Sequence, residues 1–398
     1  MKNTVLIFGG GENQLTLIKA AKELNVRSVV IDPNPDAPGK IFADNFEIVN
    51  PNDYELTKEI AIKYKAAGIV TSQMENPLRL MARLADEMGY IFPKPAVIER
   101  ARNKFLMKKA FLNGGIPCAN GKLFNKDEII DERNIFGLDF PLIIKPADAF
   151  SSRGVFKVGC FEELKKLEPI TRGFSSDKSI LVEEFIEGNE LSIEAITYKG
   201  DTHIIQYTKK LVTPFPYTVE MGHIQPADIT TLEKEEINSI VKKSINALGI
   251  DNTATHTELK ITNKGAVIIE IGARLGGDFI SSYLTQSSTG VNMDKAAIQI
   301  ALGQEPDIRH TVQNYSYIKY LELPVSTTIV EVEEWRELLK NDDVVFGGIH
   351  VKPGDMVKPI EHSAARPGFI IVKGSSITEV KNKADNYLIE LKYKIHYT

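Results

Sequence analysis

The first 95 residues alternate between short apolar runs and segments with helical periodicity, and this alternation restricts the fold more than any other feature of the sequence. The apolar runs predict strands at residues 5–8, 29–31 and 68–71. The helical segments follow them, at residues 14–24, 54–65 and 77–88. Strands that alternate with helices favour an open, mostly parallel sheet, so we expect an α/β domain here.

A glycine-rich turn, Gly9-Gly10-Gly11, follows the first predicted strand and opens the first helix. Such a turn places backbone N–H groups where an anion can bind. Asp32 closes the second strand, where dinucleotide-binding folds keep the acid that binds ribose. The dinucleotide fingerprint needs a third glycine, however, and Gln14 occupies that position. Two interpretations stay open: nicotinamide binding, or a tight turn in a related α/β domain.

Beyond residue 95 the pattern changes. Residues 100–111 predict a basic helix, after which short apolar runs predict a small, more antiparallel unit with strands at residues 140–145, 155–158 and 180–184. Further strands are expected at residues 191–198, 203–207, 255–261 and 266–271, before a tail of short strands with glycine turns over residues 315–398.

Two acidic residues on successive predicted strands, Glu258 and Glu270, lie twelve residues apart across a short turn. In such a hairpin their carboxylates can face each other, with His256 and Lys260 on the same face as Glu258. Mg²⁺ prefers hard oxygen ligands, usually one or two carboxylates together with nucleotide phosphates. Two exposed strand acids are the alternative, but Glu270 lies in an apolar run, where an unpaired carboxylate is costly.

Two cationic residues accompany these acids. Arg274 follows Glu270 by four residues, and a guanidinium there suits the oxygens of a phosphoryl group or acyl phosphate. The alternative is that Arg274 neutralises one of the acids. Lys145 ends an apolar strand, where a lysine is a suitable point charge for a phosphate.

Two further segments have the character of a nucleotide site. Ser151-Ser152-Arg153-Gly154 resembles a hydroxyl-rich flap whose N–H groups can cover phosphates, and a solvated turn is its alternative. The strand that contains Glu183, Glu184, Phe185 and Ile186 can offer backbone groups to an adenine, with a following acid for the ribose hydroxyls.

Composition excludes several classes of protein. The 48 basic and 53 acidic residues give a net charge of −5, so we expect no nucleic-acid partner. Two cysteines, Cys118 and Cys160, provide neither a disulfide framework nor a metal-binding spacing. No apolar stretch approaches the ~20 residues that cross a bilayer, so we expect no membrane partner and a cytoplasmic α/β enzyme or binding protein.

In this order, the motifs resemble those of the ATP-grasp superfamily of ATP-dependent carboxylate–amine (or carboxylate–thiol) ligases, over about residues 3–375. The resemblance implies an α/β protein with a Rossmann-like pre-ATP-grasp domain, a two-lobed ATP-grasp domain and a small β-rich C-terminal subdomain. The implied bounds are 1–95, 96–310 (small lobe about 115–187, large lobe about 188–310) and 311–398.

The same resemblance implies roles for individual residues. ATP would be bound by Lys104, Lys145, the flap Ser151, Ser152, Arg153 and Gly154, the adenine hinge Glu183, Glu184, Phe185 and Ile186, the ribose acid Glu190, and His223. The metal ligands would be Glu258 and Glu270, for Mg²⁺ or alternatively Mn²⁺, and the catalytic cations Arg274 and Lys145. His223 and His256 each have a structural role as the alternative.

The sequence departs from the family pattern at Gly272, where many members have an asparagine that binds a second metal. The run from Glu270 to Gly277, with His256 before Glu258, is most similar to bacterial amino-acid (dipeptide) ligases. The implied substrates are a small carboxylate and an amine or other nucleophile, and a homodimer is expected as an option. Two alternatives remain: a purine-biosynthesis type of carboxylating or formylating enzyme, and a nucleotide-binding module without turnover.

Overall fold

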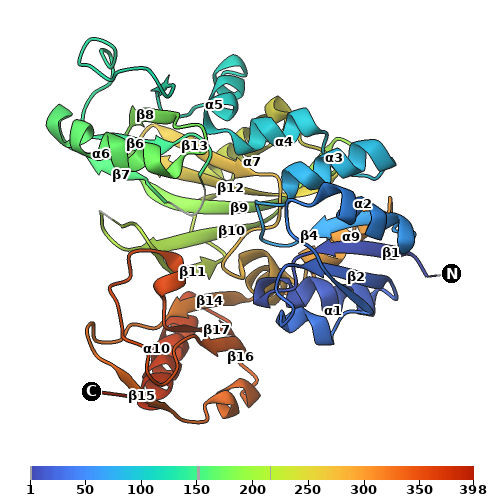
Figure 1. Cartoon of the computed structure of the whole chain (residues 1–398). Helices are drawn as coiled ribbons and strands as arrows, with labels where there is room; N and C mark the ends of the chain where they lie inside the picture. Colours follow the sequence, from blue (N-terminus) through green and yellow to red (C-terminus); the bar gives the residue numbers. More distant parts are fainter. Residues whose placement is uncertain (1, 150–152, 216) are drawn as a thin grey trace.

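The computed structural model describes residues 2–149, 153–215 and 217–398. Figure 1 shows an N-terminal domain (blue) beside one long sheet, a small lobe (cyan to green) over one end of that sheet, and a C-terminal domain (orange to red) at the other end. Among the described residues, no helix has both the length and the apolar character needed to span a bilayer.

The N-terminal domain is a parallel sheet in the order β3-β2-β1-β4, which confirms the alternating pattern of the sequence. Its strands are β1 (Thr4–Phe8), β2 (Arg27–Asp32), β3 (Asn45–Ile48) and β4 (Gly68–Thr71). Its helices are α1 (Leu15–Glu23), α2 (Tyr54–Lys63) and α3 (Leu78–Met88). Every residue of β1 is buried, because this strand lies inside the sheet with helices on its faces.

The small lobe is an antiparallel sheet in the order β5-β8-β6-β7, packed against α6 (Phe161–Phe174). Its strands are β5 (Gly121–Phe124), β6 (Leu142–Pro146), β7 (Phe156–Val158) and β8 (Ile180–Glu184). This lobe has its own apolar core, in which Leu142, Val158 and Leu164 are completely buried.

The long sheet has eight strands in the order β13-β12-β9-β10-β11-β14-β17-β16, and all of its neighbouring strands are antiparallel. Its strands are β9 (Asn189–Tyr198), β10 (Asp201–Val212), β11 (Glu220–Gln225), β12 (Thr253–Thr262), β13 (Gly265–Gly272), β14 (Tyr315–Tyr320), β16 (Val344–Ile349) and β17 (Gly368–Gly374). The associated helices are α7 (Thr231–Leu248), α8 (Thr285–Thr289) and α9 (Met293–Ala301). The C-terminal domain therefore continues the same sheet that carries both predicted metal acids.

The short strands expected over residues 315–398 are present, but the sequence analysis missed α10 (Ile377–Tyr393), a helix of 17 residues. Its buried residues Val380, Ala384, Leu388 and Leu391 form one face, and Ser376 caps its N-terminus by accepting from the N–H of Glu379. A small sheet of β15 (Ile329–Val332) and β18 (Ile395–Tyr397) completes this domain.

The predicted helix at residues 100–111 is two helices, α4 (Pro95–Arg102) and α5 (Lys104–Asn113). The break occurs at Asn103, whose side chain accepts from the N–H groups of Phe105 and Leu106 and so starts a new helix. Lys104 consequently stands in the first turn of α5.

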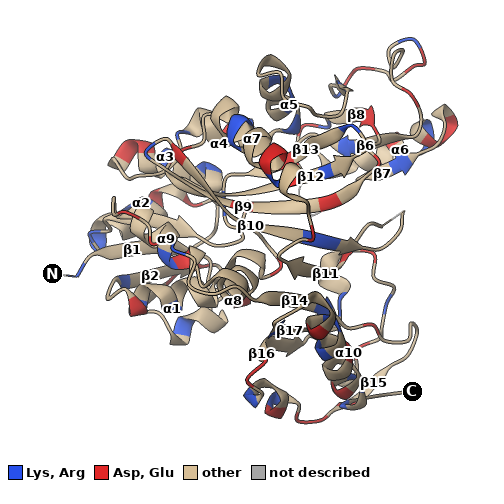
Figure 2. Ribbon diagram, turned by 180° about the vertical axis from the view of Figure 1, so that it is seen from behind, with Lys and Arg blue, Asp and Glu red and all other residues tan. Residues whose placement is uncertain are grey.

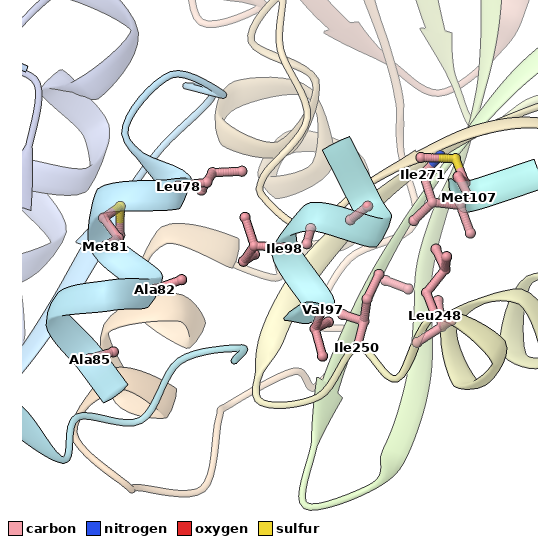
Figure 3. Close-up of a cluster of buried hydrophobic side chains, with 14 of the residues drawn as sticks. Leu78, Met81, Ala82, Ala85, Val97, Ile98, Met107, Leu248, Ile250 and Ile271 are labelled. Carbon is pink, nitrogen blue, oxygen red and sulfur yellow. The ribbon is translucent and has the colours of Figure 1, made fainter. Parts of the chain in front are cut away.

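A continuous apolar core fixes α5 against the strand that carries Glu270. Figure 3 shows Met107 of α5 beside Ile271 of β13, and the N–H of Ile271 lies 3.4 Å from the Met107 sulfur. Val97 and Ile98 of α4 pack in the same core with α3 and with the end of α7. Burial of these side chains holds Lys104 close to the hairpin of β12 and β13.

Candidate active site between two sheets

A cavity of about 600 Å³ lies between the small lobe and the long sheet. Its walls include most of the residues predicted for ATP and metal binding: Lys104, Lys145, Glu183, Glu184, Phe185, Ile186, Glu190, His223, Glu258, Glu270 and Arg274. They come from α5, β6, β8, β9, β11, β12, β13 and the segments that follow these strands. Figure 2 shows acidic and basic segments close together on the small-lobe strands and on the facing strands of the long sheet.

The hairpin of β12 and β13 places Glu258 directly opposite Glu270 in register, as the spacing predicted. Each carboxylate holds a cation already: Lys210 Nζ lies 3.0 Å from Glu258 Oε1, and Lys104 Nζ lies 2.8 Å from Glu270 Oε2. Burial would raise the pKa of Glu258, but Lys210 and His256 outweigh burial and hold it well below its usual value. Two facing carboxylates that attract cations are suitable ligands for Mg²⁺.

The protein itself offers a metal few further ligands. Over residues 2–149, 153–215 and 217–398, no group of three or more His, Cys, Asp or Glu side chains has the arrangement of a metal site. Gly272 is paired with His256 across the hairpin and has no side chain to contribute. The remaining ligands of a bound metal would therefore be phosphate oxygens and water, as is usual for Mg²⁺.

Lys210 of β10 is a site residue that the sequence analysis missed. Its ammonium lies among three carboxylates, at 2.8 Å from Glu190, 3.3 Å from Glu220 and 3.0 Å from Glu258. Burial would lower the pKa of Lys210, but these acids raise it well above its usual value, so it is charged. Extending the predicted strand at residues 203–207 to Val212 would have placed Lys210 on a buried strand.

Lys145 and Glu183 form a buried pair in the wall of the cavity. Lys145 contacts one oxygen of Glu183, and Lys108 Nζ lies 3.0 Å from the other. Burial would raise the pKa of Glu183, but the two lysines lower it, so the carboxylate is charged. The side chain of Glu183 thus faces lysines and is not directed to an adenine.

In the predicted adenine hinge, two backbone N–H groups already donate hydrogen bonds within the protein. The N–H groups of Glu184 and Phe185 donate to the carbonyls of Asn120 and Pro141, at 2.9 and 3.1 Å. An adenine cannot use these two donors, which leaves Ile186 as the hinge residue whose backbone we expect it to contact. The ring of Phe185 packs edge to face on Phe215, with centroids 5.6 Å apart.

Arg274 neutralises neither predicted metal acid, so that alternative is wrong. Its Nε lies 3.0 Å from Glu75, in the loop after β4, and its Nη1 donates to the carbonyl of Leu275. Arg102 approaches the same carboxylate of Glu75 at 3.5 Å. The sequence signal for Glu75 was its place after a parallel strand, where α/β sheets commonly bind ligands.

The two histidines are both buried and both paired with acids. His256 Nδ1 lies 2.5 Å from Glu194, and its Nε2 lies 3.5 Å from Glu258. Burial would lower the pKa of His256, but Glu194 outweighs it and raises the pKa to about 9. His223 Nε2 lies 3.1 Å from Asp278. Both rings line the cavity, so a structural role and a ligand contact are compatible.

Of the predicted flap, Ser151 and Ser152 lie outside the described residues. Arg153 and Gly154 are described but are not among the residues that line the cavity, although Ala149 and Val155 on either side are. Gly154 has a φ of 73°, and a Cβ there would come within 3 Å of the Phe174 ring, so this position requires glycine.

The glycine turn of the N-terminal domain is not built for a dinucleotide. Asp32 accepts from the N–H of Gly10 at 2.7 Å and from the N–H of Asn34 at 2.8 Å, so the acid is used to hold the turn. The cavity beside it has a volume of about 30 Å³, which is about the volume of one water molecule. Of the two interpretations, a tight turn fits this geometry.

Three family models match consecutive parts of the chain: the ribonucleotide synthetase preATP-grasp domain at residues 1–102, the ATP-grasp domain at residues 138–282, and the L-amino acid ligase C-terminal domain 2 at residues 319–396. The chain is 26% identical to dapdiamide A synthase of Enterobacter agglomerans over 313 residues, 75% of this chain and 73% of that protein. It is also 26% identical to an alanine–anticapsin ligase of Bacillus subtilis over 283 residues, which cover 64% of this chain and 58% of that protein.

Solved structures of the same architecture cover the whole chain. The L-amino acid ligase of Bacillus licheniformis superposes with a TM-score of 0.84 at 22% identity, covering 100% of this chain and 98% of that one. Phosphoribosylglycinamide synthetase of Anaerococcus prevotii gives a TM-score of 0.79 at 23% identity over both complete chains. The cavity between two antiparallel sheets and the three consecutive domain matches agree, and the chain is similar to ATP-grasp ligases over residues 1–102, 138–282 and 319–396.

Proposed function

We propose that this protein activates a substrate carboxylate as an acyl phosphate with ATP and joins it to an amine, releasing ADP and phosphate. The observation that carries the proposal is the cavity in which two facing carboxylates, Glu258 and Glu270, share one space with Lys145 and Arg274. Such a site can bind a triphosphate with its metal and still leave a cation for a second anionic group.

The cavity has an apolar end suited to a purine. Ile143, Val155 and Phe185 belong to the small lobe and Ile269 to β13, and all four line the same space. The backbone of Ile186 would contact the base edge, and Glu190 would accept from the ribose hydroxyls. Glu190 is oriented for this by Lys210 at 2.8 Å and by Lys260 at 3.9 Å.

The phosphates would lie between Lys145, Lys104 and the hairpin of β12 and β13. These lysines pair with Glu183 and Glu270, so phosphates would compete with the two carboxylates for charges that are already positioned. Mg²⁺, or Mn²⁺ as an alternative hard cation, would neutralise phosphate oxygens between Glu258 and Glu270 when bound.

The substrate carboxylate would approach from the side of Arg274. Its oxygen attacks the γ-phosphorus of ATP, ADP leaves, and an acyl phosphate results. The amine then attacks the acyl carbon and phosphate leaves with the bonding electrons of the C–O bond. Arg274, held between Glu75 and its own loop, would neutralise charge on the transferring phosphoryl group through its planar fork.

The similarity to L-amino acid ligases makes amino acids the first substrates to test, and we keep the homodimer and the cytoplasmic location as predictions. A screen of amino acid pairs and small carboxylates with Mg·ATP would measure ADP release, with mass spectrometry of the product. We expect ADP release that depends on both a carboxylate and an amine, with a product lighter than its two substrates by one water.

Two other results would contradict the proposal. ADP release that requires bicarbonate or formate and an aminated nucleotide would favour the purine-biosynthesis type of enzyme. Tight binding of Mg·ATP without turnover on any pair would favour a nucleotide-binding module. Repeating the screen on Glu270→Gln tests the site itself. Glu236→Gln is its matched control, because Glu236 accepts from the N–H of Ala266 on the same hairpin but does not line the cavity.

A further inference from the structure

The loop that leaves β13, residues 274–279, carries Arg274 into the cavity and then adopts an unusual backbone conformation. Asp278 and Phe279 are consecutive residues with φ of 51° and 60°. A residue with a Cβ rarely adopts this left-handed conformation, and two in succession persist only where the surroundings hold them. The contacts of this loop should therefore reveal what fixes the position of Arg274.

The long sheet fixes one side of the loop. Gly276 lies so close to β9 and β12 that a Cβ there would come within 2.6 Å of the Glu194 carboxylate and 2.7 Å of the His256 ring. The carbonyl of Gly276 accepts from the hydroxyl of Ser281 at 2.8 Å. These contacts hold the middle of the loop, and His223 of β11 lies 3.1 Å from Asp278 at its left-handed end.

The C-terminal domain fixes the other side. Arg366, just before β17, donates from Nη1 and Nη2 to the two carboxylate oxygens of Asp278, at 2.7 Å each. The Phe279 ring stacks on Phe369 of β17, with centroids 4.9 Å apart and an angle of 26° between the planes. Both left-handed residues are thus held by one short segment of the C-terminal domain.

Arg366 is itself held by several groups. It is buried, lies 3.6 Å from the centre of the Tyr320 ring, and donates to the carbonyls of Glu220 and Ser363 at 3.0 and 2.8 Å. The side chain of Glu220 in turn contacts Lys210. Arg366 therefore connects the Arg274 loop to β11, the strand whose Glu220 contacts Lys210.

We propose that Arg366 is a positioning residue: through its fork on Asp278, the C-terminal domain holds the 274–279 loop so that Arg274 is ready for the transferring phosphoryl group. The proposal rests on the proposed function for its catalytic consequence only. Arg366 acts through Asp278 and Arg274, and an ammonium cannot replace its two parallel hydrogen bonds.

The test compares purified Arg366→Met and Arg366→Lys with wild type. We expect kcat for ADP release to fall at least tenfold in Arg366→Met and somewhat less in Arg366→Lys. The Kd for Mg·ATP should stay within twofold, because the groups that Arg366 contacts, on Asp278, Glu220, Ser363 and Tyr320, are not assigned to the nucleotide. Lys383→Met is the matched control, since it breaks ion pairs to Asp343 and Glu379 within the same domain and does not line the cavity.

A second measurement does not depend on activity. Hydrogen–deuterium exchange of residues 274–284 without ligand should be faster in Arg366→Met than in wild type or Lys383→Met, and Asp278→Asn should reproduce this if Arg366→Met does not fold. Unchanged exchange together with kcat within threefold of wild type would overturn the proposal. Faster exchange in a protein whose wild type turns over no substrate pair would support the positioning role while contradicting the proposed function.

Discussion

Two regions of this molecule have the sequence character of a nucleotide site, and they use their polar groups in opposite ways. At the glycine turn after β1, the carboxylate of Asp32 accepts hydrogen bonds from the N–H groups of Gly10 and Asn34, and the adjoining cavity has a volume of about 30 Å³. At the hairpin of β12 and β13, Glu258 and Glu270 line a cavity of about 600 Å³ and pair with the ammonium groups of Lys210 and Lys104.

From this difference we infer that an acid bonded by backbone N–H groups is structural, whereas an acid paired only with long side chains is available to a ligand. A lysine ammonium can move by rotating its four-carbon stem, whereas a backbone N–H in a tight turn cannot. We therefore expect the carboxylates of the hairpin to exchange a lysine for a metal ion, whereas Asp32 cannot leave its turn without losing its hydrogen bonds to Gly10 and Asn34.

The largest effect should come from the hairpin. Glu270→Gln should lower kcat at least 10³-fold, about 4 kcal/mol of transition-state stabilisation, because a neutral amide cannot hold a metal and its phosphates in place. The thermal midpoint should change little, since the amide oxygen can still accept from Lys104. Steady-state ADP release measures the loss, and kcat within tenfold of wild type at ordinary Mg²⁺ concentration would remove Glu270 from the metal site.

The next largest effect should be on the free energy of unfolding, and it should come from Asp294, a buried acid of α9. Burial raises the pKa of Asp294 to about 6, despite a hydrogen bond from Ser72. The unfolded chain loses this proton near pH 4 and the folded protein near pH 6, so the folded state is progressively destabilised between these values and the penalty is complete above pH 6.

Asp294→Asn should therefore raise the free energy of unfolding by about 1–3 kcal/mol at pH 7.5 and change it little at pH 4. Urea unfolding at the two pH values measures the difference. Equal effects at both pH values would show that Asp294 titrates in the folded protein as it does in the unfolded chain.

The smallest effect should come from the turn itself. Asp32→Asn weakens hydrogen bonds to Gly10 and Asn34, which we expect to lower the free energy of unfolding by about 1 kcal/mol. Turnover should stay within twofold of wild type. A large loss of activity in a folded Asp32→Asn protein would contradict a purely structural role for the glycine turn.

Local patterns of the sequence predicted the parallel N-terminal sheet, the strands of the small lobe and the opposition of Glu258 and Glu270, because alternation and turn spacing depend on neighbouring residues. Long-range pairing was not visible in the same way. Lys210 joins three acids from three different strands, and Glu75 reaches Arg274 across 199 positions of the chain. No spacing rule connects such residues before the fold is known.

Other differences have local causes that the sequence did contain. Asn103 divides one predicted helix by capping the second half, and Ser376 followed by Glu379 marks the start of α10. The role of Arg366 had no such signal, because it depends on the C-terminal domain extending the long sheet beside the loop after β13.

The most direct test of the account is a calorimetric titration of the protein with Mg·ATP and, separately, with NAD, repeated on Lys145→Met. We predict that Mg·ATP binds wild type, that the Kd rises at least tenfold in a folded Lys145→Met protein, and that NAD gives no binding heat. Binding of NAD by wild type, or binding of Mg·ATP that is unchanged in Lys145→Met, would contradict the claim that the nucleotide site lies between the two sheets.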